Sequence, residues 1–136
     1  MPRLTAVVAL GLSLSACATL PAEQPVSVAG SITYRERIAL PPTTQIEIRI
    51  DDVSLADAPS RTIARQSFTA DGRQVPFPFR LTVDRRQLDP RGSFALSARI
   101  TDAAGRLMFI TDTRNTISFD DRPAIDMGAI TLVKTH

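Results

Sequence analysis

Few side chains in this sequence have the types and spacing that covalent or acid–base chemistry requires. The 136-residue chain holds one cysteine, Cys17, and one histidine, His136, which is its last residue. Two adjacent acid pairs, Asp51-Asp52 and Asp120-Asp121, lack the spaced carboxylates of a calcium loop. Cysteine and histidine do not recur with the spacing of metal ligands, and no glycine-rich loop has the pattern that holds phosphate. The sequence therefore predicts a non-enzymatic protein without a metal site or a cofactor.

The residues around Cys17 suggest a different use for its thiol. A short positive start, Met-Pro-Arg, precedes eleven uncharged and mostly apolar residues (4–14). This run is too short to span a hydrocarbon core, which needs about 20 residues, but it has the length of a signal-peptide core. The three residues before Cys17 resemble the lipobox of bacterial lipoproteins, in which a peptidase cleaves before the cysteine and the thiol accepts lipid. This predicted lipobox consists of Leu14, Ser15 and Ala16.

We therefore expect residues 1–16 to be a lipoprotein signal peptide and Cys17 to carry the lipid that attaches the protein to a membrane. The alternative is an ordinary secretory peptide with a cysteine at this place by chance. Two or more acyl chains give stable anchoring, whereas a single chain holds a protein only marginally. Ala18, not aspartate, follows the cysteine. By resemblance to known sorting signals, this implies an outer-membrane lipoprotein whose domain faces the periplasm. Residues 17–25 contain two prolines and no strand pattern, which predicts a lipidated tether.

The charge of the chain argues against a nucleic-acid partner. The sequence has 16 Lys and Arg against 14 Asp and Glu, and one arginine lies within the first sixteen residues. The remaining balance is 15 − 14, or +1. Arginines alternate with acids along the chain, whereas nucleic-acid-binding domains cluster their basic residues on one face. This pattern predicts a mixed, solvated surface.

A periodicity of two predicts that residues 26–136 form a single all-β domain. Apolar and polar residues alternate through most segments, and turn signals rich in Pro, Asp and Gly separate these segments at regular intervals. Seven or eight short strands with this spacing predict one antiparallel β-sandwich, immunoglobulin-like or transthyretin-like in shape. The strands are expected near 26–35, 45–53, 61–69, 75–83, 93–101, 106–112 and 125–133, with a short eighth around 117–119.

Two irregularities refine this expectation. Pro76 and Pro78 cannot donate hydrogen bonds and fall on the same side of their strand, so the strand 75–83 should lie at a sheet edge. The apolar phase of the last strand slips across Gly128, which predicts a β-bulge there.

Several short motifs, taken in order, resemble the YbaY/YscW-type lipoproteins over about residues 28–133. The motifs are Gly30 to Pro42, Glu47 to Ser54, Gln74 to Phe79, Leu88 to Pro90, Ala95 to Ile100 and Gly105 to Thr113. This family includes pilotins of type III secretion, which bind the C-terminal tail of a secretin subunit and carry it to the outer membrane. The resemblance thus implies a pilotin-like or chaperone-like interaction module whose partner is a secretin or another envelope protein. The alternative is an envelope lipoprotein with a ligand-binding, stress-related or structural role and no secretin partner.

Four residues are candidates for partner binding. Arg35 and Arg37 precede a Leu-Pro-Pro turn and could contact an acidic partner, or they could simply be a solvated strand end. Phe77 and Phe79 could hold the apolar face of a helix beside the proline-blocked edge, or they could be core residues. The low aromatic content, 5% without tryptophan, argues against a sugar site, which usually stacks rings.

Overall fold

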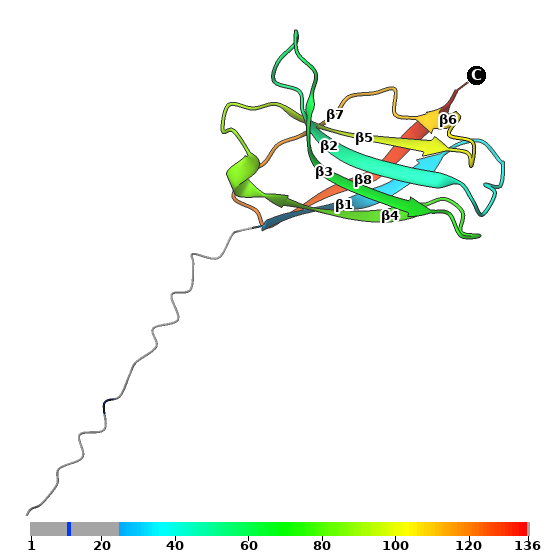
Figure 1. Ribbon diagram of the computed structural model, residues 1–136, viewed down its shortest axis with the longest axis horizontal. Coiled ribbons are helices and arrows are strands. Elements are labelled where there is room, and N and C mark those ends of the chain that lie inside the picture. The colour runs from blue at the N-terminus through cyan, green and yellow to red at the C-terminus, as the bar shows by residue number, and fades with distance from the viewer. Residues whose placement is uncertain (1–10, 12–24, 136) are drawn as a thin grey trace, which may run out of the picture.

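The structure, a computed structural model, describes Gly11 and residues 25–135 of the chain. The described residues form eight strands and one short 3-10 helix, η1 (Figure 1). Their bounds are Pro25–Tyr34 (β1), Gln45–Asp52 (β2), Arg61–Thr69 (β3), Phe77–Asp84 (β4), Arg85–Gln87 (η1), Phe94–Thr101 (β5), Leu107–Ile110 (β6), Asn115–Ile117 (β7) and Ala124–Lys134 (β8). The all-β prediction is confirmed, and the seven predicted strands lie where they were expected to within a few residues. The short eighth strand ends at Ile117, where it was expected to begin.

Along each strand, side chains point alternately into the core and toward the solvent. In β4 every second side chain, from Phe77 to Val83, is buried, and in β2 the three isoleucines are fully buried. These inward side chains from both layers form one hydrophobic core. Burial of apolar surface contributes about 25 cal/mol per Å², so this shared core is the main source of stability.

The strands form one mixed sheet in the order β3-β2-β5-β6-β8-β1-β4, with β7 paired to β5 beside β6. Strands β2, β3 and β5 make one layer, and β1, β4 and β8 make the other (Figure 1). The layers are joined because β6 pairs with β5 on one side and with the end of β8 on the other. The domain is therefore a nearly closed, barrel-like sheet and not two separate sheets of a sandwich.

The prediction of a purely antiparallel arrangement was wrong for one central pair. Strands β1 and β8 run parallel, from Ser27 opposite Ala124 to Tyr34 opposite Leu132. All other strand pairs among the described residues are antiparallel. A parallel pair needs a long crossover, and here nearly the whole domain lies between its two strands. Alternation within each strand does not reveal such a pairing.

Strand β4 ends the sheet, which confirms that the proline-bearing strand lies at an edge. Its free edge faces β3, and side chains close the seam between these two strands. The amide of Arg80 donates to Oε1 of Gln66 at 3.1 Å, and the rings of Phe68 and Phe77 meet edge to face with centroids 5.8 Å apart. Near η1, the Arg61 guanidinium donates to the carbonyl of Gln87 at 3.1 Å. The seam is thus held by side chains and not by a strand ladder.

The predicted bulge in β8 is also confirmed. The register between β1 and β8 shifts between Ala29 and Ser31, and Gly128 adopts a positive φ of 66°. The carboxylate of Asp126 accepts a hydrogen bond from the Gly128 amide at 2.8 Å. A positive φ is readily available only to glycine, which accounts for this residue at the bulge.

The sheet has two ends, which we name by the entry of the chain. The proximal end is where β1 begins at Pro25, and it includes η1 and residues 53–60, 85–93 and 118–123. The distal end includes residues 34–44, 70–76, 102–107 and 134–135. A ten-residue strand such as β1 spans about 30 Å, which approximates the distance between the ends. Strands β1 and β8 run from the proximal to the distal end (Figure 1).

Candidate partner-binding site

Part of the predicted chemistry lies outside the described residues. This applies to Cys17, to the lipobox of Leu14, Ser15 and Ala16, and to His136. The tether prediction, 17–25, falls there as well except for Pro25, which is the first residue of β1. The lipid on Cys17 therefore remains a prediction. Among the described residues, no helix is long and apolar enough to cross a membrane.

The aromatic residues predicted beside the proline edge are core residues. Phe77 is 1% exposed and Phe79 is 4% exposed, because both alternate inward along β4. Neither ring faces an open groove, so the expectation that they contact a partner directly is not met. Their side chains support the edge strand from inside.

Arg35 and Arg37 lie on the surface at the distal end, just after β1. Neither guanidinium takes part in a hydrogen bond or an ion pair with another described residue. The segment that follows them is fixed, because Gln74 bonds both backbone groups of Leu40: Oε1 accepts from its amide at 2.8 Å, and Nε2 donates to its carbonyl at 3.1 Å. The two arginines therefore lie on a loop that is fixed by hydrogen bonds, and their charged groups are available to an acidic partner.

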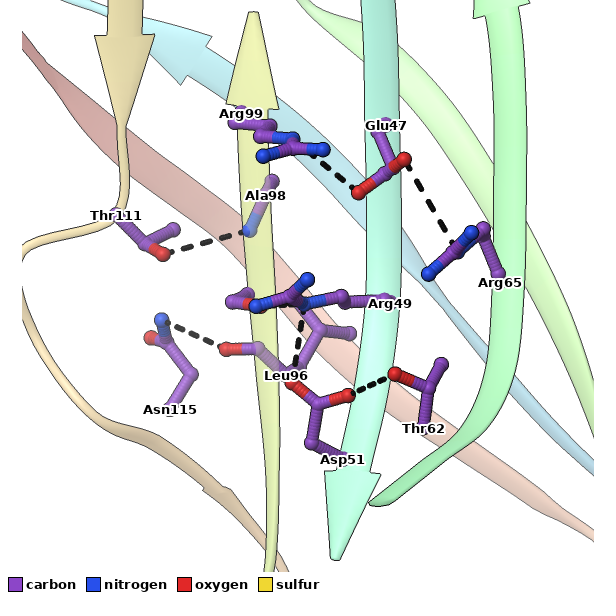
Figure 2. A network of polar contacts seen from close by, with 11 residues as sticks. Glu47, Arg49, Asp51, Thr62, Arg65, Leu96, Ala98, Arg99, Thr111 and Asn115 are labelled. Atoms are coloured by element: carbon purple, nitrogen blue, oxygen red, sulfur yellow. Dashed lines mark hydrogen bonds and ion pairs between the residues drawn. The ribbon is translucent and has the colours of Figure 1, made fainter. Parts of the chain in front are cut away.

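The outward face of β2, β3 and β5 carries a network of charged side chains (Figure 2). Glu47 lies between two arginines: its Oε1 is 3.2 Å from Nε of Arg99, and its Oε2 is 4.0 Å from Nε of Arg65. Oε1 of Glu47 is buried, and its contact with Arg99 is an ion pair without hydrogen-bond geometry. Because the two arginines come from β5 and β3, Glu47 ties together the three strands of this layer.

The second part of this network centres on Asp51, whose side chain is nearly buried. Its Oδ2 lies 3.0 Å from Nε of Arg49, and its Oδ1 accepts a hydrogen bond from Thr62 at 2.7 Å (Figure 2). Nε of Arg49 also lies 3.3 Å from the hydroxyl of Ser97 on β5. Each carboxylate of the network is thus paired with at least one arginine. An arrangement of this kind stabilises a solvent-facing sheet and leaves no activated nucleophile or general base.

Aspartates with a shifted pKa stabilise turns of the chain. Hydrogen bonds and the charge of Arg86 lower the pKa of Asp84, and Arg122 does the same for Asp120. Hydrogen bonds from the amide of Arg106 and its neighbours lower the pKa of Asp102. All three carboxylates accept hydrogen bonds from amides two or more residues ahead, the geometry of an Asx turn. No group of three or more His, Cys, Asp or Glu side chains among the described residues could hold a metal ion.

The proximal end contains a hollow of about 420 Å³. Phe94 and Phe119 lie in its wall and meet edge to face with centroids 5.3 Å apart. Arg85 also lines it, but its guanidinium is occupied: it donates at 2.7 Å to the carbonyls of Asp120 and of Arg122. The charged group of this hollow is thus used to fix the loop before β8.

The distal end contains a smaller hollow of about 220 Å³ with a different lining. Ile38 and Leu107 line it and are 41% and 37% exposed. These are two of the three large apolar side chains that are exposed among the described residues, the third being Leu55 at the proximal end. Ile38 and Leu107 do not stand out in the sequence, because an apolar residue in or beside a strand is normally expected in the core. Contiguous exposed apolar surface marks interaction sites, and the distal hollow brings two of these three side chains together.

The fold defines a class: a small all-β domain built on one mixed sheet. Residues 23–127 match the family described as type III secretion system lipoprotein chaperone (YscW). This match covers more than half of the chain, and the chain belongs to that family. The resemblance seen in the sequence motifs is thereby confirmed.

Two related proteins add to this assignment. The chain is 40% identical over 93 residues to the uncharacterized lipoprotein YbaY of Escherichia coli (strain K12), which covers 68% of this chain. It spans only about half, 48%, of that relative's own length. It is also 40% identical to an alternative pilotin from the type II secretion system of Vibrio cholerae, whose solved structure superposes with a TM-score of 0.74. That superposition covers 82% of this chain and 98% of the pilotin.

Proposed function

We propose that this protein is a non-catalytic lipoprotein, anchored in the outer membrane through Cys17, which binds a secretin subunit in the periplasm and escorts it to the membrane. The observation that carries the proposal is the match of nearly a whole solved pilotin, at 40% identity, to the described domain. The family description as a lipoprotein chaperone of secretion supports the same role.

The arrangement of charges favours a binding role over catalysis. The carboxylates of the outer face are paired with arginines, whereas Arg35 and Arg37 at the distal end have no such partner among the described residues. Unpaired surface charges speed up association and select partners of opposite charge. Arg35 and Arg37 lie close together on one exposed loop and are suited to the capture of an acidic segment.

The anchor gives this binding its direction. Pro25 lies eight positions after Cys17, and an extended chain of that length reaches about 30 Å at most. Lipid on Cys17 would therefore hold the domain close to one membrane, which raises its effective concentration near partners in that membrane. A bound subunit would be confined to the same surface.

In-cell crosslinking of the full chain, followed by purification and mass spectrometry, tests the proposal. A Cys17→Ala variant is the matched control, because it lacks the acceptor thiol and keeps the folded domain. We expect the unaltered protein to recover a secretin, and the variant to lose or mislocalise it. Recovery of abundant outer-membrane proteins alone, with no secretin in either sample, would show that the partner is not a secretin. That outcome would favour an envelope lipoprotein with another role.

A further inference from the structure

The distal hollow concentrates exposed apolar surface on a rigid frame. The hydroxyl of Tyr34 donates to the carbonyl of Ile38 at 2.8 Å, and the Tyr34 ring stacks on Phe109 with centroids 4.2 Å apart. On the opposite side, Thr135 donates from its amide to the carbonyl of Met108 at 2.9 Å and from its hydroxyl to that of Leu107 at 2.6 Å. The exposed side chains of Ile38 and Leu107 thus extend from backbone that is already held by hydrogen bonds. Binding of a partner would require little further ordering of this backbone. Such preorganisation reduces the entropic cost of binding.

Positive charge surrounds this apolar pair. Lys134 and Arg106 line the hollow, and Arg37 directly precedes Ile38. The only acid in the lining is Asp102, whose Oδ2 is already 3.1 Å from Nε of Arg106. The lining carries two cations and one acid, a formal charge of 2 − 1, or +1, and the adjoining loop contributes Arg37 together with Glu36. Lys134 and Arg37 form no ion pair with another described residue.

The size and position of the hollow restrict what could occupy it. At about 220 Å³ it is smaller than the roughly 300–1,000 Å³ of sites that enclose drug-sized ligands, so it suits one or two apolar side chains of a polypeptide. It lies at the end of the sheet opposite Pro25, where the chain enters from the anchor segment. The length of β1 therefore separates the hollow from Pro25.

We propose that the distal hollow binds an amphipathic segment of a partner protein, inserting an apolar side chain between Ile38 and Leu107 and placing carboxylates against Arg37 and Lys134. This inference rests on the proposed function, because it gives the non-catalytic module its contact surface and defines the chemistry of the partner segment. The driving forces are burial of the apolar pair and charge complementarity at the rim. A short helix with leucines at i, i+3 and i+4, flanked by glutamates, has this chemistry.

Two labelled peptides test the proposal against the full lipoprotein in nanodiscs, with binding followed by fluorescence anisotropy. Both peptides carry the same leucines on one helical face; one has flanking glutamates and the other has lysines at the same positions. We expect the glutamate peptide to bind at least about tenfold more tightly. The double variant Ile38→Ser, Leu107→Ser should weaken its binding by about tenfold or more, since it removes the apolar contact.

The chain provides a matched control at its other end. Leu55 is the most exposed large apolar side chain, at 71%, and lies in the proximal loop. Leu55→Ser should leave binding of the glutamate peptide unchanged. Lys134→Glu together with Arg37→Glu should reverse the preference toward the lysine peptide. All five substituted positions are exposed, so these variants should keep the circular dichroism spectrum of the unaltered protein.

Equal binding of the two peptides, or equal weakening by Leu55→Ser and by the distal variants, would overturn the proposal. Self-association of the unaltered protein that is lost in the distal double variant would also overturn it, because a second copy would then occupy the hollow. The result is separable from that of the crosslinking experiment. Recovery of a secretin without peptide binding at the distal end would leave the proposed function standing and reject this site. Peptide binding at the distal end without recovery of a secretin would support this site and reject a secretin as the partner.

Discussion

The two ends of the sheet are built alike but differ in what they leave exposed. Each end places an aromatic pair in or beneath the wall of a hollow: Phe94 with Phe119 at the proximal end, and Tyr34 with Phe109 at the distal end. At the proximal end the arginines of η1 and of the loop before β8 bond to neighbouring aspartates or carbonyls. At the distal end Arg37 and Lys134 form no such bonds within the described chain.

This difference indicates which end leaves charged side chains available for binding. Charges that are satisfied within the fold contribute to turn geometry and offer little to a partner. Charges that remain unpaired beside exposed apolar side chains do not stabilise the fold and are available to a partner. The hollow with the larger volume is therefore not the better candidate, since its charged group is already occupied.

Removal of one ring from each aromatic pair should give the largest effect. Phe109 is fully buried, and Phe109→Ala should lower the free energy of unfolding by about 3–5 kcal/mol. Phe119 is only partly buried, so Phe119→Ala should cost less, about 1–2 kcal/mol. Urea unfolding followed by circular dichroism measures both. A larger loss for Phe119 than for Phe109 would mean that the proximal pair is the structural one.

Addition of a methyl group at one glycine of each end separates crowding from backbone strain. A Cβ on Gly92 would lie 2.7 Å from the Phe94 ring and 3.0 Å from the carbonyl oxygen of Asp89, so Gly92→Ala should cost about 1–3 kcal/mol. Gly105 has open space around its Cα but a φ of 83°, so Gly105→Ala should cost only about 1–2 kcal/mol. Thermal unfolding of the two variants compares them. No loss in Gly92→Ala would show that the proximal turn is not tightly packed.

Loss of one hydroxyl should loosen the distal end selectively. Tyr34→Phe keeps the ring stacked on Phe109 but removes the hydrogen bond to the carbonyl of Ile38. The expected cost is about 1 kcal/mol in the free energy of unfolding. Amide exchange should accelerate in residues 35–40 and remain unchanged around η1. Faster exchange at the proximal end as well would contradict the independence of the two ends.

Acid should weaken the proximal turns through their aspartates, and this effect should be the smallest. Asp84 and Asp120 have lowered pKa values in the folded protein because Arg86 and Arg122 hydrogen-bond their carboxylates. A folded-state pKa below the unfolded one, near 3.9, gives stability that is present above about pH 4 and is lost as the pH falls through the folded-state pKa. The variant Asp84→Asn, Asp120→Asn should therefore show a flatter decline of the urea midpoint between about pH 5 and pH 2. An unchanged decline would mean that other carboxylates determine acid sensitivity.

Sequence periodicity could predict the strands, the edge position of β4 and the bulge at Gly128, because each depends on residues close together in the chain. It could not predict the parallel pair of β1 and β8. Alternation tells which face of a strand is buried, but the identity of a neighbouring strand depends on contacts between distant segments. The same limit applies to the closure of the sheet through β6, which rests on two residue pairs, Phe109 with Lys134 and Ile110 with Val133.

The candidate site was only partly predictable for a related reason. Arg35 and Arg37 drew attention because charge is visible in the sequence, and the structure places them at the distal surface. Phe77 and Phe79 drew attention because they lie beside prolines, but alternation turns them inward. Ile38 and Leu107 are far apart in the chain and come together only because the loop after β1 lies over the start of β6. The signal that could have identified Ile38 is its position between a charged run, Arg35 to Arg37, and a Leu-Pro-Pro turn.

The parallel pair of β1 and β8 also bears on how such a chain is made. Ser27 and its partner Ala124 are 124 − 27, or 97, residues apart. The edge of β1 that pairs with β8 is therefore covered only after the last strand has been made. Contacts of such sequence separation slow folding. A chain that crosses a membrane amino end first would expose an incomplete sheet until its final strand emerges. Premature termination before residue 124 would remove a central strand and not a dispensable tail, so truncated copies should be degraded and not accumulate as partly active protein.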